Sequence, residues 1–138
     1  MATQPDDGKV LVVNAQETQV IVMSPDLRTA VHIVPIGPKL GSVVADRGDH
    51  FTATLTGYDS GIDAGPGVIR ANIRTRGLAP VAGRRHVGII DGVGADASFM
   101  HPYSIASSPR GWLVEDEHFV REIHRRTLRV RTLGHDLR

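Results

Sequence analysis

The last third of the chain, residues 88–134, places the tightest constraint on the fold. It begins with an Asp-Gly turn at Asp91, continues through an apolar anchor at Phe99, and then alternates strand-forming segments with turn residues. The four predicted strands span residues 103–107, 111–115, 119–125 and 128–133. Gly, Pro, Asp and Ser between such segments are typical of strands joined by tight turns. This region therefore predicts a four-stranded antiparallel sheet, with Trp112 as a second apolar anchor.

Two earlier units repeat this pattern less regularly, and helical patterning is thin throughout. Three strands are predicted in the first unit, at 9–14, 20–23 and 30–34, and four in the second, at 42–46, 51–56, 68–73 and 78–83. The first two segments are almost uniformly apolar, which indicates strands buried on both faces. The glycine-rich segment 57–67 is longer than a hairpin turn, so we expect it to form an inserted loop.

The order strand, turn, strand, glycine recurs along the chain. Residues 73–83 and 123–134 both have it, and residues 30–37 repeat the closing strand and its glycine. A period of about 40 to 50 residues with four strands per unit is typical of β-propeller blades. The period alone leaves a β-sandwich open.

Specific residues favour the propeller. Residues 82–134 closely resemble one blade of an NHL-repeat β-propeller, on the segments 91–94, 111–116, 120–123 and 130–134. The resemblance continues with less detail over 40–83 and 9–37. It implies an all-β, propeller-like fold of about three consecutive antiparallel blades of three to four strands. The approximate blades are 9–37, 40–83 and 88–134, in one domain at 9–138 after a flexible N-terminus at 1–8.

Three blades are too few to close a ring at the native twist of β-sheets. The first unit also lacks a predicted opening strand. The NHL resemblance implies six blades, which two copies of the chain would supply through two identical junctions. The alternatives are a partial propeller capped by its own loops, or a truncated or decayed piece of a longer one. Exposed strand edges at the open ends would then be the sites of association.

Composition gives no global signal for a charged partner. The 16 Lys and Arg residues nearly balance the 15 Asp and Glu residues, for a formal net charge of +1. The chain contains no cysteine, which excludes disulfides and thiolate sites. Its start is polar and acidic, unlike a secretory signal, and no apolar segment approaches the ~20 residues of a membrane helix. We therefore expect an intracellular, cytoplasmic protein with no membrane partner.

Motifs for catalysis, cofactors or metals are absent from the sequence. Strand alternation would place His118, Glu122 and His124 on one face, but turn and edge histidines are the more common explanation. The acidic segment 91–96 lacks the ligand spacing of an EF-hand. Phosphate-binding loops and Gly-x-Ser-x-Gly are also missing. The sequence predicts no cofactor, no metal and no enzyme, with a propeller-type hydrolase or lyase as the alternative.

Arginine is concentrated near the C-terminus. The basic residues that we expect on one rim of the domain are Arg84, Arg85, His86, Arg121, Arg125, Arg126, Arg129 and Arg131, with Arg138 beyond them. Such a rim would bind phosphates, and NHL propellers include RNA binders with a basic face. Edge charges also prevent aggregation of strands, and few aromatic residues are available to stack on bases.

The sequence therefore predicts a non-enzymatic protein-binding or assembly scaffold. The partner is another protein or a second copy, bound through loops such as 57–67 and through exposed strand edges. RNA binding through the basic rim is the alternative.

Overall fold

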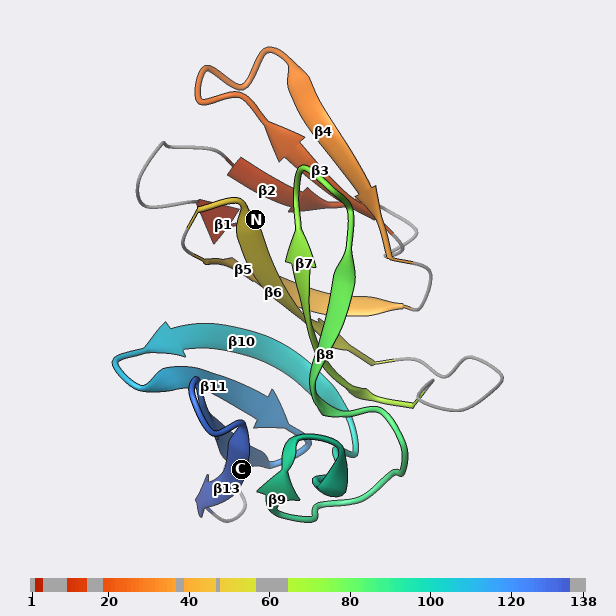
Figure 1. Cartoon of the computed structure of the whole chain (residues 1–138), viewed down its shortest axis with the longest axis vertical. Helices are drawn as coiled ribbons and strands as arrows, with labels where there is room; N and C mark the ends of the chain where they lie inside the picture. Colours follow the sequence, from red (N-terminus) through yellow and green to blue (C-terminus); the bar gives the residue numbers. More distant parts are fainter. Residues whose placement is uncertain are drawn as a thin grey trace.

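The computed structural model describes residues 2–3, 10–14, 19–36, 39–46, 48–56 and 65–134. This part of the chain contains thirteen strands and one 3₁₀ helix, η1 (Gly94–Asp96). The strands form three antiparallel sheets, which follow one another along the long axis of the molecule (Figure 1). The all-β prediction is confirmed, and the three sheets do not close into a ring.

Sheet one holds the N-terminal strands in sequence order. They are β1 (Ala2–Thr3), β2 (Val10–Val13), β3 (Gln19–Met23) and β4 (Ala30–Pro35). The sequence predicts only the last three of these. It places residues 1–8 in a flexible terminus, whereas Ala2 and Thr3 pair with Leu11 and Val10. A two-residue strand has no periodicity that a sequence can reveal.

Sheet two forms the middle layer, with β5 (Leu40–Ala45), β6 (His50–Leu55), β7 (Gly67–Asn72) and β8 (Leu78–Gly83). All four strands were predicted. Phe51 through Leu55 are buried at every position, so the strand that is covered on both faces is β6. The prediction that 9–14 and 20–23 are such strands is wrong, because Val12 and Ile21 remain half-buried on one face of sheet one. Residues 57–64 of the predicted loop lie outside the described residues.

Sheet three contains β10 (Pro102–Ser108), β11 (Gly111–Asp116), β12 (Phe119–His124) and β13 (Arg129–Gly134). A fifth strand, β9 (Gly92–Val93), pairs with the outer side of β13 through Val93↔Arg129 and Gly92↔Val130. The Asp-Gly segment that was expected to be a turn thus contributes a short strand, followed by η1.

Two apolar cores lie between the layers. The first joins Leu11, Val22 and Val34 of sheet one to Phe51 and Ile69 of sheet two. The second lies between sheets two and three. It contains Val68, Val81, Ala82, Ala97, Phe99, Trp112, Val114, Ile123 and Val130. Phe99 and Trp112 are 0% and 2% exposed, so both predicted anchors are buried between sheets.

The first strands of consecutive sheets lie next to one another. β5 contacts both β1 and β10. The Thr54 hydroxyl donates to the Tyr103 carbonyl at 2.8 Å, and the Ile105 amide donates to the Ser42 hydroxyl at 3.0 Å. Arg76 connects sheets two and one, with Nε donating to the Ile33 carbonyl at 3.1 Å. The three sheets are therefore linked by polar contacts as well as by their cores.

The last hairpins of sheets two and three match residue for residue. Asn72 and His124 begin the two turns, and their side chains accept hydrogen bonds from the second and third following amides. Each turn ends on a positive φ, 63° at Arg76 and 59° at Leu128, whose amides bond back to Asn72 and His124. Both strand pairs also have one register shift at the same distance from the turn. Sheet one has a positive φ at Leu27 in its last hairpin.

Candidate binding surfaces

Arg121 is the best-connected of the predicted site residues, and it lies in the interior. Its side chain is 0% exposed and forms an ion pair with the equally buried Asp116, Nη1 to Oδ2, at 2.8 Å. Nη1 also donates to the Ser98 carbonyl and Nη2 to the Ile90 carbonyl, both at 2.9 Å. The guanidinium carbon lies 4.7 Å from the centre of the Phe99 ring. Arg121 therefore fastens residues 90–99 to sheet three, and its prediction as part of a binding surface is wrong.

Asp91 contributes to the same connection from the solvent side. It accepts the Thr132 hydroxyl at 2.7 Å and the Thr132 amide at 3.2 Å, and Arg121 Nη2 lies 3.4 Å away. Partial burial acts to raise the pKa of Asp91. The hydrogen bonds from Thr132 and the charge of Arg121 outweigh burial, so the net pKa is below its ordinary value. The ionised carboxylate therefore stabilises the fold.

This lowered pKa predicts the direction of an acid effect on stability. A carboxyl group whose pKa is lower in the folded state stabilises the protein above the unfolded-state pKa of about 3.9, and the contribution is lost as pH falls through the folded-state pKa. The thermal midpoint should therefore decrease below about pH 4, and Asp91→Asn should make this decrease shallower. Melting curves from pH 7 to pH 2.5 measure both, with Glu115→Gln as an exposed control. An unchanged pH dependence in Asp91→Asn would contradict this role.

The other basic residues do not form one rim. Arg84 lies after β8, where Nη1 donates to the Gly65 carbonyl, and Arg85 and His86 are exposed beside it. Arg125 is held over the Trp112 ring at 4.5 Å and pairs with Asp46 of sheet two at 2.9 Å. The two basic clusters therefore belong to different sheets. Arg138 lies outside the described residues.

A basic depression lies on the outer face of sheet three, the face turned away from sheet two. Its volume is about 300 Å³, and it is lined by Arg110, Glu122, His124, Thr127, Arg129 and Arg131. Arg131 pairs with Glu122 at 3.0 Å. The guanidinium groups of Arg110 and Arg129 have no ion-pair or hydrogen-bond partner in the part of the chain that the structure describes. Arg126 lines a neighbouring depression that shares Arg110 and His124. Arg110 lies in the β10–β11 turn and was not among the site residues predicted from the sequence.

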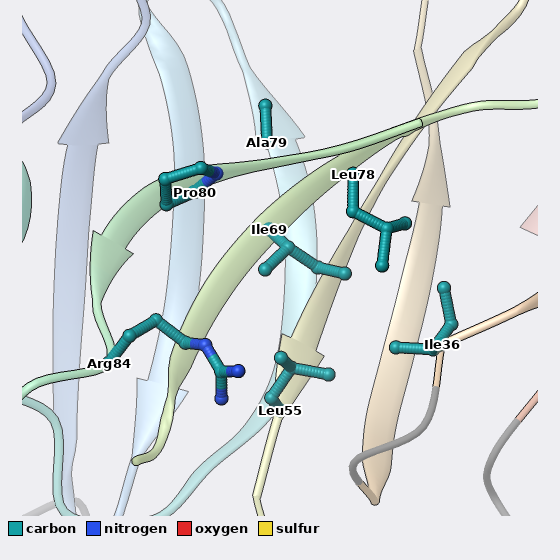
Figure 2. A pocket seen from close by; sticks show the side chains of 7 residues that line it. All are labelled: Ile36, Leu55, Ile69, Leu78, Ala79, Pro80 and Arg84. Carbon is teal, nitrogen blue, oxygen red and sulfur yellow. The ribbon is translucent and has the colours of Figure 1, made fainter. Parts of the chain in front are cut away.

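An apolar groove of about 260 Å³ opens between sheets one and two. In Figure 2, Leu55, Ile69 and Leu78 lie opposite Ile36 across this groove, and the Arg84 side chain reaches its end. Ala79 and Pro80 of the edge strand β8 complete the lining. Its surface suits an apolar side chain or a small apolar ligand.

The outer face of sheet one, turned away from sheet two, is also apolar. Val12, Ile21 and Ile33 lie directly opposite one another on β2, β3 and β4. Met23 is half-buried on the same face. Ile33 is 44% exposed, and Val31 of the same strand is 47% exposed. Val12, Ile21 and Ile33 belong to neither of the two described cores.

The described residues show no metal-binding group of three His, Asp or Glu side chains. Of the three residues that strand alternation would place on one face, His124 accepts the Arg126 and Thr127 amides at Nδ1, and Glu122 is paired with Arg131. Among the described residues, no helix has the length and apolarity needed to cross a membrane.

Comparison with known proteins gives similarity of fold. No protein-family model and no curated protein matches the chain. Among solved structures, an auxiliary nutrient binding protein from Bacteroides ovatus ATCC 8483 is similar, with a TM-score of 0.67 and 20% sequence identity. The match covers 95% of this chain and 34% of that protein, so the chain spans about a third of its length. At this identity the similarity concerns the fold alone.

Proposed function

We propose that the three sheets are consecutive NHL-type propeller blades and that the chain is a non-enzymatic binding and assembly module. Three observations support the blade interpretation. Each sheet contains four strands in sequence order, the first strands of successive sheets are neighbours, and the last hairpins of sheets two and three repeat the same turn. A propeller consists of four-stranded sheets arranged around a central axis, with the first strand of each sheet nearest to that axis.

The outer face of sheet one carries the functional part of the proposal. In sheets two and three, the corresponding face packs against the preceding sheet, through Phe51 and Ile69 in one case and Trp112 and Ile123 in the other. In sheet one, the described residues of this face, Val12, Ile21 and Ile33, belong to neither core. Complete burial of an exposed Val or Ile gains about 1.5–3 kcal/mol, and half-exposed Val31 and Ile33 would each gain about half of that. This face is the assembly surface.

We infer that the occupant is the same face of a second copy. The outer faces of two copies of sheet one can pack as a sandwich around a twofold axis, with the Val12, Ile21 and Ile33 rows interdigitating. A six-bladed ring would instead bury this face against the outer face of sheet three. That arrangement would bring Arg129, Arg131 and Glu122 into contact with apolar side chains, at the cost of removing charges from water.

Light scattering during size-exclusion chromatography tests the proposal. The chain should be dimeric at micromolar concentrations, and Ile33→Lys should make it monomeric, because an ammonium group would be buried in the contact. Leu133→Lys is the matched control, since Leu133 is 48% exposed on β13 of sheet three. Circular dichroism should show that both variants keep the fold.

Each variant separates the alternatives. A dimer that only Ile33→Lys disrupts supports packing through sheet one. Disruption by both variants would indicate the ring, and a monomeric wild-type chain would refute self-association.

RNA binding through the predicted basic rim has less support, because Arg121 is buried and Arg125 is engaged by Asp46 and Trp112.

A further inference from the structure

We propose that the basic depression on sheet three is a binding site for a phosphate group. The site lies on the opposite end of the molecule from the sheet-one assembly surface, so it does not depend on self-association. Arg110, Arg129 and Arg131 approach it from the β10–β11 turn and from β13, and His124 and Thr127 come from the turn between β12 and β13.

The groups that line the depression are almost all hydrogen-bond donors. His124 Nδ1 accepts the amides of Arg126 and Thr127, at 3.2 and 3.4 Å, so the neutral ring carries its proton on Nε2. The Thr127 hydroxyl oxygen accepts the Arg129 amide at 3.3 Å, which leaves its hydrogen available to a ligand. Glu122 is the one carboxylate among the described lining residues, and Arg131 pairs with it at 3.0 Å. An anionic ligand rich in hydrogen-bond acceptors, such as a phosphate group, satisfies this lining.

The matching hairpin of sheet two shows that the fold does not require these arginines. There, a basin of about 320 Å³ at the corresponding place is lined by His50, Arg70, Asn72, Gly77, Leu78 and Ala79. Gly77 and Ala79 stand where sheet three has Arg129 and Arg131. In sheet two the Asp49 carbonyl accepts the Ile73 amide, and in sheet three the Arg110 carbonyl accepts the Arg125 amide. Asp49 and Arg110 are therefore at corresponding positions, and sheet two has an acidic residue where sheet three has an arginine. Sheet two forms the same turn and strand with Gly77 and Ala79 at these positions. The fold therefore does not account for Arg129 and Arg131, and a binding role does.

The size and lining of the depression favour a phosphomonoester or free phosphate over a nucleic acid. A volume of about 300 Å³ is at the lower end of ligand sites. No Phe, Tyr or Trp is among the described lining residues, whereas sites for single-stranded nucleic acids usually stack bases on such rings. The shared chemistry is a tetrahedral oxyanion held by guanidinium groups.

Titration of the full chain with inorganic phosphate, followed by calorimetry in low-salt buffer, tests the site. Arg110→Gln and Arg129→Gln should each weaken binding roughly tenfold or more, because each removes charge-assisted hydrogen bonds. Arg28→Gln is the control, since Arg28 is an exposed arginine in the last hairpin of sheet one. Glu122→Gln should strengthen binding, because it frees Arg131 and removes the one negative charge. A purely structural cluster would not give this gain.

Competition identifies the source of the phosphate. Displacement of inorganic phosphate by a phosphoserine peptide supports a phosphoprotein ligand, and binding of phosphate without this displacement supports the free ion. The proposal is overturned if no heat of binding is seen, or if Arg28→Gln weakens binding as much as Arg129→Gln. Binding of oligouridylate that phosphate does not displace would also overturn it, in favour of a nucleic acid.

Discussion

Replacement of Arg121 by methionine is expected to lower the free energy of unfolding by about 3–5 kcal/mol, the usual cost of removing one partner of a buried ion pair. Asp116 would remain at 0% exposure without its ion-pair partner, and among the described residues the amides of Met100 and His101 would be its remaining donors. The connection 90–99 would also lose the bonds from Arg121 to the Ile90 and Ser98 carbonyls. Urea denaturation followed by fluorescence measures the loss, because the single tryptophan, Trp112, is buried in the adjoining core.

Arg129→Met is the matched control for this experiment. Arg129 lies on the neighbouring strand β13, is exposed, and should change stability by less than about 0.5 kcal/mol. Arg121→Lys keeps the charge but not the planar fork that reaches several acceptors, so it should give an intermediate loss. If Arg121→Met is as stable as Arg129→Met, the interior role assigned to Arg121 is wrong.

Gly83→Ala should be the second severely destabilising change. Gly83 has a φ of 78°, and a Cβ there would lie 2.7 Å from Phe99 Cδ1 and 2.9 Å from the Pro66 carbonyl oxygen. The left-handed backbone costs about 1–2 kcal/mol for a residue with a Cβ, and overpacking of a core costs typically about 1–3 kcal/mol more. The combined loss of about 2–5 kcal/mol should appear as a lower denaturation midpoint.

Gly48→Ala separates the two causes. Gly48 has a similar φ of 62°, but a Cβ there meets no atom within 4 Å. It should therefore lose only the backbone component, and the difference between the two variants reports the contact with Phe99 and Pro66. Equal losses of stability would show that Phe99 and Pro66 shift to accommodate the added methyl group, and that the backbone conformation alone accounts for the destabilisation.

The strands of sheets two and three were predictable because turn residues and strand-forming segments alternate clearly there. In β6 the pattern does not predict burial, since Thr52 and Thr54 are polar residues but are fully buried between sheets. Thr54 is satisfied by Ser42 and Tyr103, residues that the sequence does not bring together. Short strands such as β1 and β9 depend on pairing with distant residues, so local sequence carries no signal for them.

The binding-surface residues were less predictable, because whether an arginine is buried or exposed depends on the tertiary structure. Arg121 and Arg131 have the same residue type and lie on paired strands, yet one is 0% and the other 60% exposed at the side chain. Strand alternation places Arg121 on the same face as Ile123, which lies in the core. The buried Asp116 and the carbonyls of Ile90 and Ser98 compensate for the buried charge. Arg110 was missed for the opposite reason, since a lone arginine in a turn gives no cluster in the sequence.

The two open ends of the molecule differ in a way that limits the size of any assembly. A stack of repeats grows for as long as each added unit presents another apolar face, and a polar terminal face ends the growth. With Ile21 and Ile33 at one end and Arg129 and Arg131 at the other, the described residues present one apolar and one charged outer face. Association should therefore stop at a closed pair of chains, and filaments should not form even at high concentration.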